Sequence, residues 1–150
     1  KEKHLKILGP EPFDKFYNFR YFKNYINGKK KTIKDLLMDQ KFLAGLGNIY
    51  VNEILYLCKI KPNRKLYKLH DCEIKDIIIN TKKVLKKAII FGGSSIKNFS
   101  SGLGKKGNFQ QQFNVYGKKE NRCSNSDCSG KIKKIVISNR ASFYCSKCQK

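Results

Sequence analysis

The 150-residue sequence lacks the long apolar segments of membrane and secreted proteins. No stretch is apolar for long enough to span a bilayer, and no signal peptide opens the chain. Acidic residues are also scarce, with 11 Asp and Glu against 33 Lys and Arg, for a formal net charge of +22. We therefore expect a protein of the cytoplasm that makes no contact with a membrane.

The excess of positive charge indicates a polyanionic partner. Charges of one sign repel one another in a compact chain, and phosphate groups would relieve that repulsion. Binding of this kind weakens steeply as the salt concentration rises. The alternative is compositional: Lys, Ile and Asn are all abundant, and some of the lysines are then only solvated surface.

Four of the six cysteines lie in two close pairs near the end of the sequence. The first pair has the spacing C-x4-C and the second C-x2-C, with sixteen residues between the pairs. Two such pairs supply the four thiolates of a tetrahedral Zn²⁺ site. Their tight spacing favours a metal in a reducing compartment over a disulfide framework. We expect one Zn²⁺ per chain, bound by Cys123, Cys128, Cys145 and Cys148.

The residues between the two cysteine pairs predict a β-hairpin. Residues 131–137 and 141–144 are the expected strands, and Ser138, Asn139 and Arg140 form the expected polar turn. A bound metal would stiffen a hairpin that has too little core to fold alone. An arginine at the tip of such a unit, on so basic a chain, predicts a finger directed at nucleic acid.

The residues before the cysteine pairs predict a mainly α-helical domain. Thr32 is expected to cap a short helix with Lys34 on its polar side, and Asn48 to cap another helix after two glycines. Backbone amides at that second N-terminus could bind a phosphate; the alternative is that the glycines only allow two helices to cross. A long amphipathic helix is expected from about residue 71 to residue 91. Its apolar face would consist of Ile74, Ile77, Ile78, Leu85, Ala88 and Ile89.

Two further stretches have more than one interpretation. The aromatic-rich residues 13–22 could stack on bases, but their helical spacing favours a place in the core. Residues 100–108 contain three glycines and two lysines, which suits a loop over a ligand, with a plain connector as the alternative.

Several short motifs occur in a fixed order along nearly the whole sequence. They are Leu8–Pro12, Leu37–Gln40, Gly45–Tyr50 with Glu53, Gly92–Ser95, Val115–Gly117 and Arg140–Cys145. In this order, and with the terminal cysteine pairs, they resemble the formamidopyrimidine-DNA glycosylase (Fpg/Nei) family of DNA repair enzymes. The resemblance implies a helix–two-turns–helix domain over residues 1–117 and a zinc finger of this family over residues 118–150.

The same resemblance implies a function in base-excision repair. The family removes oxidised purines such as 8-oxoguanine and formamidopyrimidines from double-stranded DNA, and then cleaves the abasic strand by β- and δ-elimination. The resemblance also implies a monomer associated with the bacterial nucleoid. Residues 100–108 lie where the family covers the everted base.

Individual residues acquire roles from this resemblance. By position, Asn48 and Lys34 resemble residues that hold the phosphates flanking the everted nucleotide. Arg140 resembles an arginine that holds a nearby phosphate and is also credited with catalysing δ-elimination; a guanidinium is a good phosphate ligand and a poor proton donor, which favours the first role. The basic stretch before Lys34 matches a DNA contact, assigned here to Lys30 or Lys31.

The sequence departs from the family pattern at its beginning. The family's nucleophile is an N-terminal proline amine in a β-rich catalytic domain, which no residue here matches, and Lys1 would lie at the wrong place in the fold. We therefore expect the DNA-binding and zinc-finger half of a bifunctional glycosylase and AP lyase, with the N-terminal catalytic domain as its missing partner. One alternative is a stand-alone zinc-dependent DNA-binding module without catalytic activity, and another is a zinc-ribbon RNA-binding protein.

Overall fold

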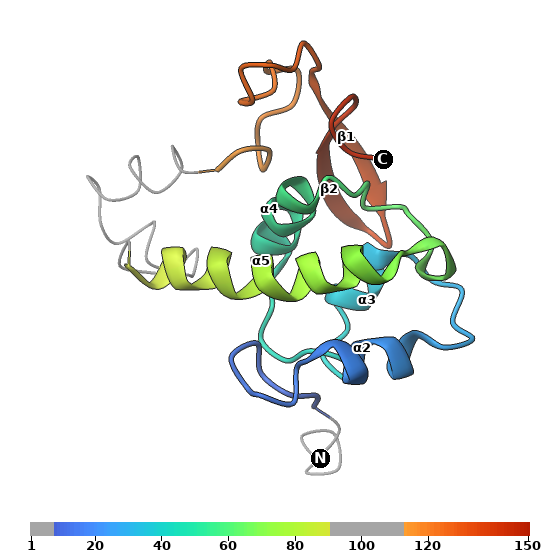
Figure 1. Ribbon diagram of the computed structural model, residues 1–150. Coiled ribbons are helices and arrows are strands. Elements are labelled where there is room, and N and C mark those ends of the chain that lie inside the picture. The colour runs from blue at the N-terminus through green and yellow to red at the C-terminus, as the bar shows by residue number, and fades with distance from the viewer. Residues whose placement is uncertain (1–7, 91–112) are drawn as a thin grey trace.

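The computed structural model describes residues 8–90 and 113–150, and its fold is mainly α-helical with one antiparallel hairpin (Figure 1). The elements described are, in chain order, α2 (Phe19–Ile26), α3 (Ile33–Leu37), α4 (Asn48–Cys58), the 3₁₀ helix η1 (Leu66–Lys68), α5 (Asp71–Ile90), β1 (Ile132–Ile137) and β2 (Arg140–Cys145). Below, residues 8–90 are called the helical part and residues 113–150 the hairpin unit. The expected loop at 100–108 and the Gly92–Ser95 motif lie outside the described residues.

Helix α5 crosses the middle of the molecule and carries much of the core (Figure 1). Its observed bounds confirm the long helix predicted from the periodicity. Five of the six predicted apolar positions are buried: Ile74, Ile77, Ile78, Leu85 and Ala88. Ile89 was wrongly predicted to be buried: among the described residues it is 61% exposed, and it lines an open surface pocket together with Phe13 and Leu85.

Only part of the aromatic-rich stretch at residues 13–22 lies in the core. Tyr17 and Phe22 are fully buried, as predicted, and they pack around the ring of Phe42. Phe13 and Phe16 are 50% and 66% exposed. Helical spacing does not apply to them, because turns precede α2 and the helix begins only at Phe19.

Helix α3 begins at the predicted cap, but its expected polar side is covered. The Thr32 Oγ1 accepts a hydrogen bond from the Asp35 N–H at 3.1 Å. Lys34, expected on the polar side, is only 1% exposed. The prediction was wrong because β2 lies against this side of the helix and receives the Lys34 ammonium group.

The hairpin pairs β1 and β2 in antiparallel register from Ile132 opposite Cys145 to Ile137 opposite Arg140. The turn contains two residues, Ser138 and Asn139, with φ of 49° and 65°. A two-residue turn with both φ values positive matches the twist of the strands it joins. Arg140 therefore begins β2 instead of completing the turn, and its backbone is fixed by the ladder.

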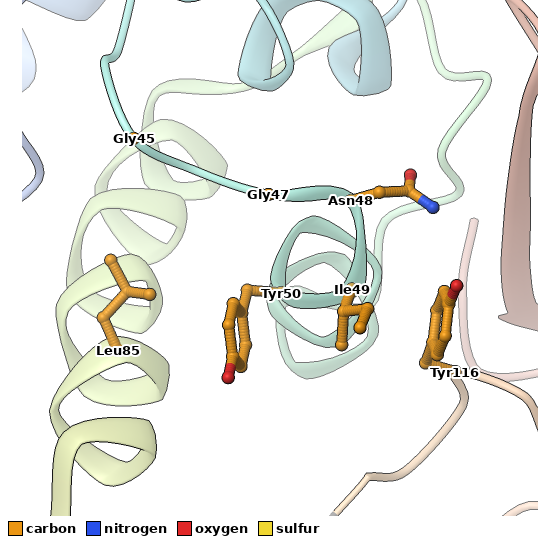
Figure 2. A pocket seen from close by; sticks show the side chains of 7 residues that line it. All are labelled: Gly45, Gly47, Asn48, Ile49, Tyr50, Leu85 and Tyr116. Carbon is orange, nitrogen blue, oxygen red and sulfur yellow. The ribbon is translucent and has the colours of Figure 1, made fainter. Parts of the chain in front are cut away.

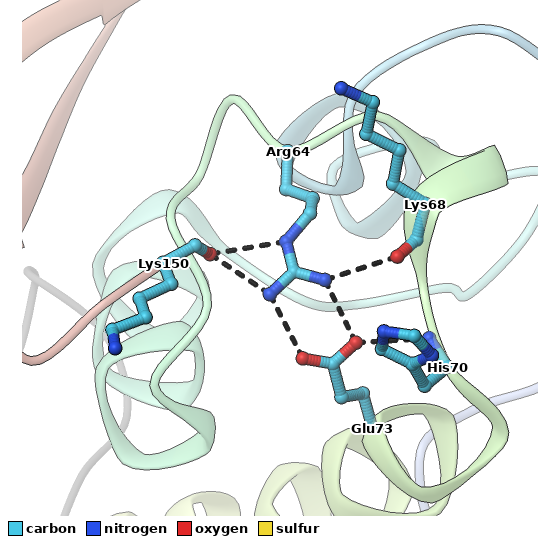
Figure 3. Close-up of polar contacts among 5 residues, drawn as sticks. All are labelled: Arg64, Lys68, His70, Glu73 and Lys150. Atoms are coloured by element: carbon cyan, nitrogen blue, oxygen red, sulfur yellow. Dashed lines mark hydrogen bonds and ion pairs between the residues drawn. The ribbon is translucent and has the colours of Figure 1, made fainter.

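The end of the hairpin unit is attached to the helical part through Arg64 (Figure 3). The Lys150 carbonyl accepts hydrogen bonds from Arg64 Nε and Nη2, at 3.1 and 3.0 Å. The same guanidinium makes a paired hydrogen bond to the Glu73 carboxylate, at 2.8 and 2.9 Å. One arginine thus joins the start of α5 to the end of the hairpin unit.

Candidate nucleic-acid interface and metal site

The four paired cysteines meet at one point of the hairpin unit. Their Sγ atoms all lie within 4.8 Å of one another, and Cys123–Cys148 and Cys128–Cys145 are both 3.6 Å apart. A tetrahedral ion with metal–sulfur bonds of about 2.3 Å needs sulfur separations of about 3.8 Å. These four residues could therefore hold a metal after small movements of the sulfur atoms.

Donors to sulfur surround the cysteine cluster. The Gly130 N–H donates to Cys128 Sγ and the Cys148 N–H donates to Cys145 Sγ, both at 3.3 Å. A Cβ atom at Gly130 would lie 2.8 Å from the Cys145 sulfur, so this close approach of the backbone needs glycine. Hydrogen bonds of this kind favour the thiolate form that binds metals.

A second cluster forms around the backbone carbonyl of Ala141, the residue after Arg140. Its oxygen accepts hydrogen bonds from Lys34 Nζ at 3.3 Å, Asn48 Nδ2 at 3.1 Å and Asn52 Nδ2 at 3.4 Å. We call these residues the Ala141 cluster. The cluster also includes Arg140, the residue before Ala141, whose side chain is exposed. Three of the five predicted DNA-binding residues, from α3, α4 and β2, are thus brought together.

Lys34 is a buried cation with uncharged hydrogen-bond acceptors. Its ammonium group donates to the Ala141 carbonyl and to Ser142 Oγ. The pKa of Lys34 is lowered to about 8, mainly by burial and then by the positive charge of Arg140, while Asp35 acts in the opposite direction. An anion near Arg140 would stabilise the charged form of Lys34.

Asn48 is the first residue of α4 and not its cap, contrary to prediction. Gly47 occupies the cap position and provides no side-chain acceptor for the amides of the first turn. The Asn48 side chain instead extends toward the strands and bonds to Ala141 (Figure 2). Its Oδ1 atom is buried and has no hydrogen-bond partner in the part of the chain that the structure describes. The uncapped first turn leaves N–H groups that can bind an anion.

A pocket of about 320 Å³ opens beside the start of α4 (Figure 2). In this view Tyr50 lies between Leu85 and Ile49, and Tyr116 faces Ile49 from the hairpin unit. The lining residues are Gly45, Gly47, Asn48, Ile49, Tyr50, Leu85 and Tyr116. The pocket thus has apolar and aromatic walls next to the uncapped helix start.

The two predicted lysines before α3 do not join the Ala141 cluster. Lys31 pairs with Asp39, with 3.4 Å between Nζ and Oδ2. Lys30 is exposed on the segment between α2 and α3. Across the described ranges, no hydrogen bond or ion pair connects either side chain to Arg140.

Sequence reasoning assigned no role in the site to three residues of α4 that bind the hairpin unit. Asn52 accepts the Phe143 N–H at 2.7 Å, and the Tyr56 hydroxyl lies 3.3 Å from Cys123 Sγ. The Glu53 carboxylate accepts three backbone N–H groups between 2.7 and 2.9 Å, from residues 114–116. The available signals were the spacing of Asn48, Asn52 and Tyr56, which puts three polar side chains on one face of the helix, and the presence of Glu53 in one of the ordered motifs.

Comparisons with known proteins agree with this geometry. Residues 8–100 match the family described as the formamidopyrimidine-DNA glycosylase H2TH domain. The chain is 39% identical over 148 residues to formamidopyrimidine-DNA glycosylase of Roseobacter denitrificans, covering 99% of this chain and 52% of the relative. It is 43% identical over 143 residues to the Rickettsia bellii protein of the same name, covering 95% and 52%.

Solved structures show the same similarity. The Lactococcus lactis enzyme bound non-covalently to DNA with an AP site superposes with a TM-score of 0.85 at 36% identity, over 99% of this chain and 53% of that chain. Its complex with FAPY-dG-containing DNA gives a TM-score of 0.84 at 36% identity, with the same coverage. The chain therefore spans about half the length of the relatives it matches. No helix among residues 8–90 and 113–150 is long and apolar enough to cross a membrane.

Proposed function

The chain belongs to the formamidopyrimidine-DNA glycosylase family, and from this we propose that it is the DNA-binding and zinc-finger half of a base-excision repair enzyme. The whole enzyme would be a glycosylase and AP lyase that acts on oxidised purines, with its nucleophile in an N-terminal catalytic domain. Support comes from the name shared by its relatives and from the damaged DNA bound in the similar structures.

The observation that carries this proposal is the Ala141 cluster. Exposed Arg140 supplies a planar guanidinium that can hold a phosphate by two hydrogen bonds. Asn48 adds a second N–H beside the uncapped start of α4, and Lys34 adds a buried charge beneath them. A DNA phosphate placed here would meet both direct donors and a favourable electrostatic field.

Arg140 acts in this proposal by holding phosphate. A catalytic part in δ-elimination would need a proton donor, and a guanidinium loses its proton too reluctantly near neutral pH. Lys30 and Lys31 would contribute weaker contacts to the phosphate backbone, since such contacts add affinity without reading sequence.

The pocket beside α4 is proposed to receive part of an everted nucleotide. An enzyme that acts on a base in duplex DNA must take that base out of the stack. Tyr116 and Ile49 offer flat and apolar walls within reach of a backbone held at Asn48.

The proposed cofactor is one Zn²⁺, bound by Cys123, Cys128, Cys145 and Cys148. The spacing of the sulfurs and the N–H groups that face them fit a closed tetrahedral site. Its role would be structural, because all four positions are taken by protein ligands and none is left for water.

A DNA titration tests the proposed function. Zinc-loaded protein is titrated against an undamaged duplex and a duplex with one tetrahydrofuran abasic-site analogue, at several salt concentrations. We expect binding that weakens as salt rises, with Asn48→Ala reducing the affinity for the abasic duplex about tenfold. Asn24→Ala, which removes an exposed asparagine of α2, is the matched control. Equal affinities of the two variants, or no binding at low salt, would refute the proposal.

A further inference from the structure

Tyr56 places a hydroxyl group at the edge of the cysteine cluster. It lies in the last turn of α4, is 9% exposed, and packs against buried residues of the hairpin unit. Its oxygen lies 3.3 Å from Cys123 Sγ and 3.2 Å from Ser124 Oγ. Tyr56 is therefore a residue of the helical part that touches a proposed metal ligand.

The hydroxyl proton of Tyr56 has two possible acceptors. Ser124 donates its own hydroxyl proton to Asn114 Oδ1, at 2.9 Å, which leaves its oxygen as an acceptor. A metal-bound Cys123 is a thiolate and can only accept a hydrogen bond. An anionic sulfur is a stronger acceptor than a neutral hydroxyl, so the proton is directed at Cys123.

The position of Tyr56 on α4 links this contact to the Ala141 cluster. Asn48, Asn52 and Tyr56 are four residues apart and lie one above the other on the helix. They bind, in turn, the Ala141 carbonyl, the Phe143 N–H and the Cys123 sulfur. One face of α4 therefore contacts both strand β2 and Cys123, the first of the four clustered cysteines.

We propose that Tyr56 is a positioning residue of the zinc site, which donates its hydroxyl proton to the Cys123 thiolate and anchors the metal to α4. This inference rests on the proposed Zn²⁺. Four thiolates give the site an excess negative charge, and an outer hydrogen bond disperses part of it while fixing the ligand's orientation. Loss of such a partner usually weakens metal binding by about tenfold to a hundredfold.

The test compares Tyr56→Phe with the wild-type protein. The substitution keeps the buried ring and removes only the hydroxyl group. We expect transfer of zinc to a chromogenic chelator to become at least about tenfold faster. In the cobalt-substituted protein, the thiolate-to-metal charge-transfer band should move to longer wavelength, because a thiolate without its hydrogen bond is a better electron donor. The control is Tyr21→Phe, which loses a 2.6 Å hydrogen bond to the Phe42 carbonyl in the helical core.

The outcomes separate this inference from the proposed function. If the wild-type protein does not bind one zinc ion, the proposed cofactor is wrong. If it binds one zinc ion but Tyr56→Phe matches Tyr21→Phe in zinc release and cobalt spectrum, only the inference is overturned. The inference also fails if Ser124→Ala shifts the cobalt band as far as Tyr56→Phe does, because the hydroxyl group would then act through Ser124.

Discussion

At the scale of the residue, the burial of Lys34 at the proposed phosphate site lowers the stability of the free protein. A lysine buried beside uncharged acceptors loses hydration that two neutral hydrogen bonds do not fully replace. Its lowered pKa expresses that loss. A DNA phosphate bound at this site would supply a negative charge near Lys34. The charged lysine, which lowers the stability of the free protein, would then stabilise the complex.

The stability of the protein should depend on pH through Lys34. Its pKa falls from 10.5 to about 8 on folding, so between these values the unfolded chain binds more protons than the folded protein. The wild-type free energy of unfolding should therefore gain up to about 3 kcal/mol from this group as pH rises through that interval. Lys34→Met should lack this gain. In urea titrations, the free energy of unfolding of the wild-type protein should therefore rise relative to that of the variant between pH 7 and pH 9.5. Parallel curves would show that Lys34 is not a strained cation.

Residue-level predictions failed where distant parts of the chain met. Lys34 and Asn48 were assigned to a polar helix side and a helix cap because local spacing favours those places. Both side chains instead bond to Ala141, about a hundred residues further along. Local pattern contains no information on such contacts, and it was the family resemblance that made both residues candidates for phosphate binding.

At the scale of the element, α4 and α5 bind different parts of the hairpin unit. Helix α4 binds it with a row of polar side chains, whereas α5 reaches its end through the pair of Glu73 and Arg64 (Figure 3). The bounds of α5 were predictable from its apolar periodicity, and the hairpin was predictable from its polar turn between the two cysteine pairs, except that Arg140 belongs to β2 and not to the turn. The polar row of α4 was not, because its partners come from a different unit.

Glu73 should stabilise the protein only when it is ionised. Burial raises its pKa, but hydrogen bonds from Arg64 and the His70 N–H outweigh that effect and hold the pKa below the usual range. Glu73→Gln should lower the free energy of unfolding by about 2 kcal/mol at neutral pH. The folded pKa is depressed, so this difference should shrink as pH falls below about 4.5. The control is Asp71→Asn, which breaks an exposed pair with Lys23 and should change little. Equal effects of the two substitutions in urea titrations would contradict the role of Glu73.

At the scale of the whole molecule, the described residues form two apolar clusters in a strongly basic chain. The larger cluster fills the helical part, and the smaller one contains Tyr56, Val115, Phe143 and three cysteines. The charge of +22 and the cysteine spacing were evident from the sequence, and they led to the expectation of a phosphate-binding function. The division at residue 117 stays a prediction, because α4 contributes to both clusters.

Removal of zinc should therefore affect the two clusters differently. A chelator should unfold the hairpin unit, which has a small core, while most helical circular dichroism is retained. DNA affinity should fall at least about tenfold, because Arg140 loses its fixed position. Added zinc should restore both properties. Complete loss of the helical signal, or DNA binding unchanged by chelation, would contradict the claim that zinc stabilises the hairpin unit and positions Arg140 while the helical part folds without it.

The central claim is that the Ala141 cluster holds a DNA phosphate, and the salt dependence of binding to an abasic duplex tests it most directly. Arg140→Ala is compared with Lys133→Ala, which removes one charge from an exposed position of β1 outside the cluster. We predict that Arg140→Ala keeps one zinc ion, weakens binding at least about tenfold and reduces the slope of log affinity against log salt by about 1. We predict a much smaller loss of affinity for Lys133→Ala. If the two variants lose the same affinity and the same slope, charge alone explains binding and the cluster has no special part in it.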